Sequence, residues 1–204
     1  MGTDAVEQAI AAAAAGRPIL LPTDTVYGLA TSAERADYAA DLYRLKGRSE
    51  IQPTAIVAGS IDALIDAIPE LDERSRAIAR ALLPGPFTLV LANPARRFRW
   101  LTGPRTDTIG VRVPNLPEPA QRVADGVGCL IATSANDPGG ADPASLDDVP
   151  RRIREAVAAE IDAGTLPGVA STVIDFTGES PGVIREGAIP AAEAIERVRA
   201  MLAT

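Results

Sequence analysis

The chain repeatedly places a short apolar run directly before a small group of hydroxyl or amide side chains. Residues 19–21 (Ile-Leu-Leu) run into Thr25, and residues 130–132 (Leu-Ile-Ala) run into Ser134 and Asn136. Short apolar runs bounded by turn residues are typical of buried strands. Ligands of α/β sheets bind in the crevice beyond the strand ends. The pattern therefore predicts a sheet with a polar ligand site at its strand ends, although single hydroxyls there also serve as turn residues or caps.

Segments with helical periodicity alternate with these strands. The predicted helices cover residues 3–15, 37–45, 61–67, 72–82, a short stretch after Pro117, 148–160 and 190–202. The predicted strands cover residues 18–21, 54–58, 87–91, 108–113, 128–133, 170–176 and 182–186, and residues 22–29 read as a polar turn. Helices mixed with strands indicate an α/β domain with helices packed on a mixed sheet. No repeat and no long linker divides the 204 residues, so one domain over 1–204 is expected.

The composition excludes several kinds of chemistry. The chain has no histidine, which rules out serine-histidine triads and histidine-ligated zinc. The single cysteine, Cys129, allows no intrachain disulfide and lies in an apolar run, as an inert core residue would. A net charge of −7 argues against sequence-independent binding of duplex nucleic acid but leaves room for a local basic cleft. No membrane-spanning stretch and no basic leader are visible, so a cytoplasmic protein is expected.

One lysine stands among nineteen arginines, in the sequence Lys46-Gly47-Arg48. Lysine is a compact, mobile point charge, whereas arginine is a planar fork that stays charged. A lone lysine in a chain that otherwise uses arginine indicates a task that arginine performs badly, and it predicts that Lys46→Arg is poorly tolerated. The alternative is a solvated surface lysine, the commonest situation for this residue type.

The arginines divide by their surroundings. Arg112 and Arg185 sit inside strand-like runs, where a charge needs an anionic partner or an edge position. A bound carboxylate or phosphate would serve, and so would an aspartate or glutamate of the chain. By contrast, several arginines on amphipathic helices are expected to be solvated: Arg151, Arg152, Arg154, Arg197 and Arg199.

Other binding signals are weak or missing. The run from Arg96 to Trp100 combines arginines with aromatic rings and could stack on RNA, but the acidity of the chain favours a surface loop. The chain has neither a Walker loop nor a Gly-x-Gly-x-x-Gly motif, and no cysteine or histidine cluster could hold a metal. If a nucleotide binds, its Mg²⁺ is expected to arrive on the phosphates.

Seven short motifs stand in order along the chain. They are Pro22–Leu29 (PTDTVYGL), Lys46–Arg48 (KGR), Leu83–Leu89 (LPGPFTL), Gly110–Pro114 (GVRVP), Thr133–Asn136 (TSAN), Ser171–Asp175 (STVID) and Ile184–Gly187 (IREG). With these motifs the chain resembles the threonylcarbamoyl-AMP synthase family, the YrdC-like domain, over residues 5–190. The resemblance implies an open, twisted, mixed sheet with flanking helices and a large concave, positively charged cavity.

The resemblance also implies a reaction. The family condenses L-threonine, bicarbonate or CO₂, and ATP into threonylcarbamoyl-adenylate and pyrophosphate, which makes it a nucleotidyltransferase. Partner proteins then transfer the threonylcarbamoyl group to adenosine 37 of tRNAs. The expected cofactor is Mg²⁺ carried with ATP, without zinc, haem or flavin. The expected partners are these three substrates and the downstream transferase proteins, with at most a weak contact to tRNA or double-stranded RNA and none to a membrane.

Roles for individual residues follow from the same resemblance. It implies that Lys46 and Arg48 are the catalytic basic pair. The threonine and bicarbonate side would use Thr25, Arg112, Ser134 and Ser171. The nucleotide side would use Lys46, Arg48, Thr108, Asn136 and Arg185.

The chain departs from the family pattern at a few positions. Val57 and Leu116 stand where some relatives carry histidines, and Gln52 stands where relatives often carry lysine or asparagine. The strictness of threonine selection is therefore open. The chain also ends near residue 204, so the extra C-terminal domain of longer relatives is not expected.

Two other functions are compatible with the same fold. One is an RNA-binding module without catalysis, supported only by the Arg96–Trp100 run. The other is a carbamoyl-transfer domain of the hydrogenase-maturation type, which normally accompanies zinc-finger and acylphosphatase regions that this chain lacks. Pyrophosphate release that requires threonine would separate the synthase from both.

Overall fold

One mixed sheet organises the structure, a computed structural model that describes residues 3–49 and 51–202. Its eight strands lie in the spatial order β1-β2-β6-β3-β5-β4-β7-β8. They are β1 (Ile19–Pro22), β2 (Tyr27–Ser32), β3 (Ile56–Ala58), β4 (Phe87–Ala92), β5 (Thr108–Arg112), β6 (Cys129–Ser134), β7 (Thr172–Asp175) and β8 (Gly182–Arg185). The pairs β3–β5 and β4–β7 are parallel and the other neighbours are antiparallel, which confirms the predicted mixed α/β sheet.

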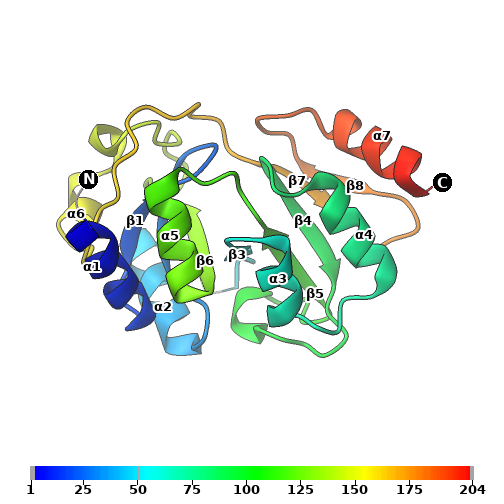
Figure 1. Cartoon of the computed structure of the whole chain (residues 1–204), viewed down its shortest axis with the longest axis horizontal. Helices are drawn as coiled ribbons and strands as arrows, with labels where there is room; N and C mark the ends of the chain where they lie inside the picture. Colours follow the sequence, from blue (N-terminus) through cyan, green and yellow to red (C-terminus); the bar gives the residue numbers. More distant parts are fainter. Residues whose placement is uncertain (1–2, 50, 203–204) are drawn as a thin grey trace.

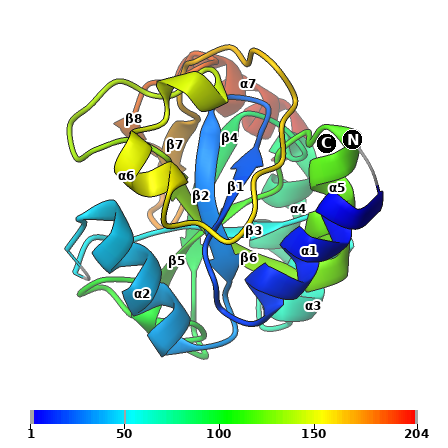
Figure 2. The same cartoon turned by 90° about the vertical axis from the view of Figure 1, so that its left-hand side faces the viewer.

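Helices flank the sheet at both ends (Figure 1). They are α1 (Thr3–Ala14), α2 (Ala36–Lys46), α3 (Ile61–Ala67), α4 (Glu73–Leu82), α5 (Glu118–Val127), α6 (Arg151–Arg154) and α7 (Ala191–Leu202), with short 3₁₀ turns at Arg99–Leu101 and Leu146–Asp148. Figure 2 shows β1 and β2 between α2 on one side and the pair α1 and α5 on the other. Helices α3, α4 and α7 lie toward the other end, near β3, β4 and β7 (Figure 1). None of the described helices combines the length and the apolar character needed to cross a bilayer.

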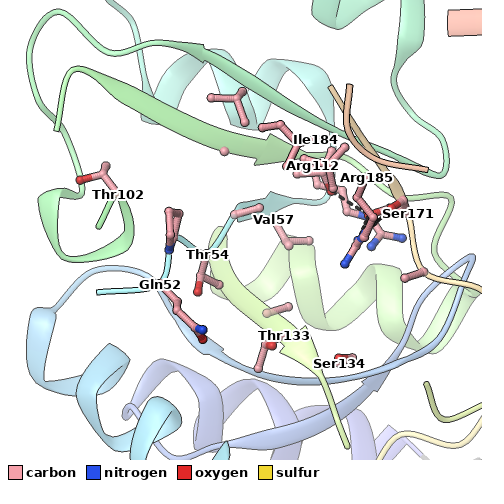
Figure 3. Close-up of a pocket in the computed structure, with 18 of the residues that line it drawn as sticks. Gln52, Thr54, Val57, Thr102, Arg112, Thr133, Ser134, Ser171, Ile184 and Arg185 are labelled. Carbon is pink, nitrogen blue, oxygen red and sulfur yellow. Dashed lines mark hydrogen bonds between the residues drawn. The ribbon is translucent and has the colours of Figure 1, made fainter. Parts of the chain in front are cut away.

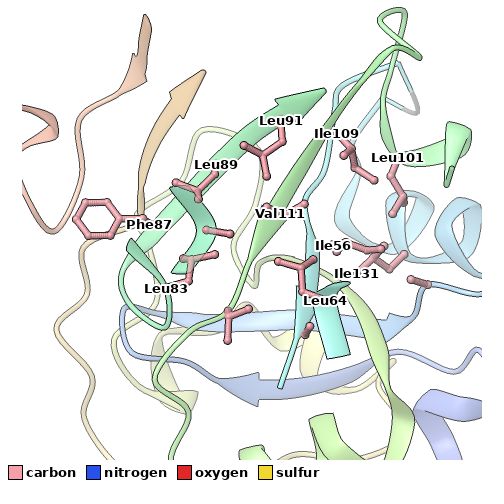
Figure 4. Close-up of a cluster of buried hydrophobic side chains, with 14 of the residues drawn as sticks. Ile56, Leu64, Leu83, Phe87, Leu89, Leu91, Leu101, Ile109, Val111 and Ile131 are labelled. Atoms are coloured by element: carbon pink, nitrogen blue, oxygen red, sulfur yellow. The ribbon is translucent and has the colours of Figure 1, made fainter. Parts of the chain in front are cut away.

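Alternation along β4 and β5 assigns opposite roles to the two faces of the sheet. Every second side chain enters the apolar core (Figure 4): Phe87, Leu89, Leu91, Ile109 and Val111. The residues between them line a cavity on the other face: Thr88, Val90, Thr108, Gly110 and Arg112. Because successive residues of a strand point to opposite faces, one short stretch of chain builds both the core and the cavity wall.

Most of the predicted elements are confirmed, and two predictions are wrong. The predicted helix 148–160 is reduced to α6, which ends at Arg154. Beyond it, the backbone of residues 158–161 bonds to β1, with Leu20 N–H donating to Ala159 O at 2.9 Å and Ile161 N–H donating to Leu20 O at 3.0 Å. Covering the free edge of β1 thus outweighs local helix propensity, since an unpaired strand edge leaves backbone groups unsatisfied.

The second error concerns residues 22–29, which read as a polar turn. The turn is confined to residues 23–26, because β1 runs to Pro22 and β2 starts at Tyr27. All six residues of β2 are buried. A strand that is buried on both sides has no alternation of polar and apolar residues, so periodicity alone does not reveal it.

The two faces of β4 predict different costs for neighbouring truncations. Leu89→Ala opens a cavity in the core and should lower the free energy of unfolding by about 2–5 kcal/mol. Val90→Ala removes methyl groups that border the cavity and should cost less than about 1.5 kcal/mol. Urea unfolding of both variants measures the difference, and equal costs would contradict the assignment of the two faces.

Candidate functional site

A cavity of about 590 Å³ lies on the face of the sheet opposite the core residues of β4 and β5 (Figure 3). Strands β2 to β8 all contribute to its wall. Much of the floor is made of small residues: Gly28, Ala55, Gly110 and Ala132. These short side chains leave the hollow open where larger ones would fill it. The site therefore occupies a sheet face as well as the strand ends where the sequence placed it.

The cavity wall carries positive charge only. Among the described residues that line it are Arg48, Arg105, Arg112 and Arg185, and none is an aspartate or glutamate. Arg112 and Arg105 are paired with carboxylates behind the wall, so a local excess of two positive charges remains in a chain whose net charge is −7. A concave, low-dielectric surface of one sign concentrates ions of the opposite sign. The cavity is thus suited to a ligand with several negative charges.

Arg112 projects from the end of β5 and is held on one side. Its Nη2 donates to Asp24 Oδ1 at 2.5 Å and to Thr25 Oγ1 at 2.7 Å. Asp24 is fixed in turn by the backbone N–H of Asn115, at 3.0 Å from Oδ2. The chain itself thus supplies an anionic partner, which was one of the two possibilities left open by the sequence. Both side chains of this pair are 11% exposed, and burial lowers the pKa of Arg112.

Arg185, at the end of β8, and Ser171, which directly precedes β7, meet at one end of the cavity. Arg185 Nη2 donates to the carbonyl oxygen of Ser171 at 2.8 Å and to its Oγ at 3.2 Å. Ser171 Oγ also shares a hydrogen bond of 2.8 Å with Thr88 Oγ1. These contacts use one edge of the guanidinium, and Arg185 remains exposed to the cavity. It can therefore present its other nitrogens to an anion.

Lys46 lies directly behind the cavity wall. Its Nζ donates to the carbonyl oxygens of Ser134, at 2.8 Å, and of Asn136, at 2.5 Å, and also to Asn136 Oδ1. The side chain is 5% exposed and does not line the cavity. Burial, aided by repulsion from Arg48, lowers the pKa of Lys46 to about 8. This placement differs from the direct ligand contact expected for Lys46, since all three ammonium donors are engaged by the turn after β6.

Gly47 explains how Lys46 and Arg48 can diverge from a helix end. Gly47 has φ 71°, in the left-handed region that favours glycine. The N–H of Gly47 donates to Arg44 O and that of Arg48 to Tyr43 O, the two hydrogen bonds of a Schellman motif. Helix α2 therefore ends at Lys46, which points at the end of β6, and the chain turns so that Arg48 enters the cavity.

Arg48 spans two walls of the cavity. Its Nη1 donates to Thr133 Oγ1 at 3.2 Å and its Nη2 to Pro53 O at 2.5 Å. Burial lowers the pKa of Arg48, and the charge of Arg185 adds to that effect. Arg48 and Arg185 are therefore close enough to repel each other.

The structure brings all nine predicted site residues to this cavity or to the layer behind it. Six of them line it: Arg48, Thr108, Arg112, Ser134, Ser171 and Arg185. Three form the supporting layer: Thr25, Lys46 and Asn136. Thr25 is fully buried and shares a hydrogen bond of 2.9 Å with Thr23 Oγ1. Asn136 accepts from Ser134 Oγ at 2.7 Å and donates to Gly140 O at 2.6 Å, which fixes the loop that follows.

Arg152, expected from the sequence on a solvated helix face, has a structural role that the sequence did not reveal. Its Nη1 donates to Leu45 O at 2.6 Å and its Nε to Asp137 Oδ1 at 2.7 Å. Arg152 thereby caps the C-terminal carbonyls of α2 and ties them to the turn that binds Lys46. No local sequence pattern marks it, because its partners Leu45, Lys46 and Asp137 are all distant from it in the chain.

Other residues singled out from the sequence are placed away from the charged end of the cavity. In the Arg96–Trp100 run, Arg97 pairs with Glu70 at 2.7 Å, and Phe98 and Trp100 pack edge to face on the apolar core. Cys129 lies against the core, and burial raises the pKa of its thiol to about 11. Arg97, Phe98, Trp100 and Cys129 therefore make contacts that serve the fold.

Of the three positions that depart from the family pattern, two lie at the cavity and one lies away from it. Val57 and Gln52 line the cavity, whereas Leu116 packs against the apolar cluster near α1 and α5. A histidine at position 57 would thus border the cavity, whereas a histidine at position 116 would lie in the apolar cluster.

Carboxylates near the cavity are already engaged. Asp24 pairs with Arg112, and Asp175 pairs with Arg105 at 3.3 Å. Within residues 3–49 and 51–202, no group of three or more histidine, cysteine, aspartate or glutamate side chains is arranged to hold a metal ion.

An open α/β sheet with an arginine-lined hollow on one face is the architecture of a domain suited to a small anionic ligand. A profile of the Sua5–YciO–YrdC family, described as "Telomere recombination", matches residues 11–187. The chain belongs to this family.

Named relatives agree with this membership. A threonylcarbamoyl-AMP synthase of Pyrococcus abyssi is 34% identical over 90% of this chain and 54% of its own length. The threonylcarbamoyl-AMP synthase of Mus musculus is 32% identical over 91% of this chain and 68% of its own length. A Mycobacterium tuberculosis relative is 30% identical over 90% of this chain and 84% of its own length.

Solved structures share the fold. Pyrococcus abyssi Sua5 complexed with L-threonine has a TM-score of 0.81 at 32% identity, covering 95% of this chain and 56% of that one. Escherichia coli YciO has a TM-score of 0.81 at 26% identity, covering 93% and 92%. A nucleotide-bound HypF, at 16% identity, has a TM-score of 0.73 over 90% of this chain and 29% of its own, a likeness of fold alone.

The single lysine provides a direct test of the buried ammonium. Its ¹³Cε resonance can be assigned without ambiguity and should titrate near pH 8 instead of 10.5. Between these values the unfolded chain retains a proton that the folded chain has lost. The free energy of unfolding should therefore rise with pH across this window, relative to Lys46→Met. A midpoint near 10.5 would contradict the buried position of Lys46.

Arg152 should influence the pKa of Lys46. Its charge contributes to the lowered pKa of Lys46, and its contact with Asp137 fixes the adjacent turn. Arg152→Ala should raise the Lys46 pKa, measured by the same NMR titration. Arg151→Ala is the matched control, because Arg151 is exposed and pairs with Glu155, the residue that directly follows α6. An equal shift of the Lys46 pKa in both variants would contradict a specific effect of Arg152 on Lys46.

Proposed function

We propose that this chain is a threonylcarbamoyl-AMP synthase, a transferase of the nucleotidyltransferase type. It would condense L-threonine, bicarbonate or CO₂, and ATP into threonylcarbamoyl-adenylate and pyrophosphate. The single observation that carries the proposal is the cavity wall, which combines four arginines and several hydroxyls without any carboxylate. Membership in a family whose relatives are named for this reaction, one of them solved with L-threonine, supports it.

The proposed reaction needs positioning more than covalent catalysis. The amine of threonine adds to CO₂ and loses a proton, which forms a carbamate. A carbamate oxygen then attacks the α-phosphorus of ATP in line, and the bond to the β-phosphate oxygen breaks as pyrophosphate leaves. Such transfers depend on orientation and on neutralisation of charge, for which guanidinium groups and hydroxyls are sufficient. The absence of histidine from the chain is compatible with this chemistry.

The charged groups of the cavity would bind different parts of the substrates. Arg112, held by Asp24, is oriented to receive the carboxylate of threonine next to Thr25. Arg185 and Arg48 are placed to receive phosphate oxygens. Ser134 and Ser171 add hydroxyls to the same cavity wall. Each group contributes a fixed donor where negative charge develops.

Lys46 would act as a positioning residue in this scheme. It holds the Ser134–Asn136 turn through three oxygens, and so it sets the direction of the Ser134 hydroxyl. Arginine at this position would bring a larger, planar group into a buried space that suits a compact ammonium.

Mg²⁺ would enter as part of the ATP substrate. The neighbouring carboxylates Asp24 and Asp175 are paired with arginines, so the phosphates and water would supply most of its ligands. The product would pass to a downstream threonylcarbamoyl-transferase that modifies tRNA, and the proposed activity would then be cytoplasmic.

Pyrophosphate release tests the proposal. Wild-type protein should release pyrophosphate from ATP only when threonine and bicarbonate are both present. Arg112→Ala should raise the KM for threonine at least tenfold, and Arg185→Ala should raise the KM for ATP, because each loses a charge-assisted contact. Lys46→Ala and Lys46→Arg should both lower kcat at least tenfold.

Arg80→Ala serves as the control, since Arg80 lies on an exposed part of α4. Release that ignores threonine would remove the amino-acid assignment, and RNA binding without ATP turnover would favour the non-catalytic alternative. Full activity of Lys46→Arg would exclude the role given to the ammonium.

A further inference from the structure

Three polar atoms in the cavity wall are buried without a hydrogen-bond partner among the described residues. They are Arg48 Nε, Arg112 Nε and Thr54 Oγ1. The two arginines have other nitrogens that donate to groups of the chain. Thr54 is different, because its hydroxyl is its only polar side-chain group and the side chain is 6% exposed. Buried hydroxyls without a partner are rare in native proteins and point to an external partner.

The side chains that flank Thr54 along the chain are uncharged, although the guanidinium of Arg48 donates to the neighbouring Pro53 O and Arg105 follows Pro104 in the cavity wall. In Figure 3, Gln52, Thr54 and Thr102 lie on one side of the cavity, and Arg112, Arg185 and Ser171 lie on the other. The remaining residues near Thr54 in the chain are apolar or small: Ile51, Pro53, Ala55 and Val57. Pro104 also lines the cavity and belongs to the same loop as Thr102. This end therefore suits an uncharged group with flat apolar faces and a few hydrogen-bonding atoms.

We infer that Thr54 is a specificity-determining residue whose hydroxyl binds the uncharged base of the nucleotide. The inference rests on the proposed function, since that function requires ATP. The triphosphate of ATP belongs with the arginines, because a desolvated anion is stabilised there by charge-assisted contacts. Its base then extends toward the end that holds Thr54, whose Oγ1 can donate to or accept from the edge of the ring.

The backbone holds Thr54 in place for this contact. Its N–H donates to Leu101 O at 2.8 Å, and the preceding carbonyl, Pro53 O, accepts from Arg48 at 2.5 Å. The hydroxyl is therefore presented from a segment that is fixed on both sides. The same guanidinium that faces the phosphates thus braces the residue that would read the base.

Thr102 provides a matched control on the same side of the cavity. Its Oγ1 already donates to Arg99 O at 3.0 Å, so its proton is committed to the chain. Thr54→Val and Thr102→Val make the same chemical change. They differ in whether the lost hydroxyl has a partner within the protein.

The test compares two ligands, ATP and inorganic tripolyphosphate, which shares the charged part of ATP and lacks the base. Thr54→Val should weaken ATP binding about five- to tenfold in calorimetry, the loss expected for one hydrogen bond, and leave tripolyphosphate binding unchanged. Thr54→Ser should restore ATP binding. Thr102→Val should leave the ratio of the two affinities as in wild type, and Arg185→Ala should weaken both ligands.

Thermal unfolding separates a binding role from a structural one. Valine matches threonine in shape and removes an unpartnered buried hydroxyl, so Thr54→Val should unfold at the same temperature as wild type or higher. Equal ATP affinity in Thr54→Val and wild type, or equal loss of both ligands, would overturn the inference and leave the proposed function intact. Threonine-independent pyrophosphate release would overturn the proposed function, whereas a selective loss of ATP binding would still support the contact with the base.

Discussion

The crowding of arginines, two of them largely withdrawn from solvent, around one cavity is the constraint on which the site depends. Burial lowers the pKa of both Arg48 and Arg112, and the charge of the exposed Arg185 lowers each of them further. Guanidinium groups stay charged under these conditions, so the fold carries the unfavourable energy of their proximity. An anionic ligand relieves that energy when it binds. Relief of this unfavourable energy adds to the free energy of binding. The same charges lower the stability of the unliganded protein.

The sheet makes this arrangement tolerable. On β4 and β5 the residues that alternate with the cavity wall are large aliphatic and aromatic side chains, and they pack into the core. Their burial offsets the cost of a charged opposite face. Asp24 and the carbonyl oxygens of Ser171 and Pro53 each hold one edge of an arginine. The protein thus orients the guanidinium groups, and it pairs two of them with carboxylates, Arg112 with Asp24 and Arg105 with Asp175.

Much of this architecture could be predicted from the sequence, since hydroxyls that follow apolar strands mark the site. Ser134 and Thr25 were found in that way, and Arg112 stood out as a charge inside a strand. The family resemblance implied a concave, positively charged cavity, but its place on the sheet face could not be predicted, because the role of Val90 or Gly110 depends on which strand lies beside it. The same limit hid Arg152 and the pairing of residues 158–161 with β1, which both rely on distant segments. Local patterns show which face a residue can occupy, and tertiary neighbours decide what that face does.

The burial of Lys46 has a chemical consequence for an enzyme that makes the proposed product. Threonylcarbamoyl-adenylate is a mixed anhydride, and anhydrides of this kind acylate neutral amines readily but leave guanidinium groups alone. The chain has one side-chain amine, and the turn from Ser134 to Asn136 encloses it. The nineteen arginines provide positive charge that such an electrophile does not consume. The preference for arginine, together with one sheltered lysine, gives a protein that can hold its reactive product without becoming a target of it.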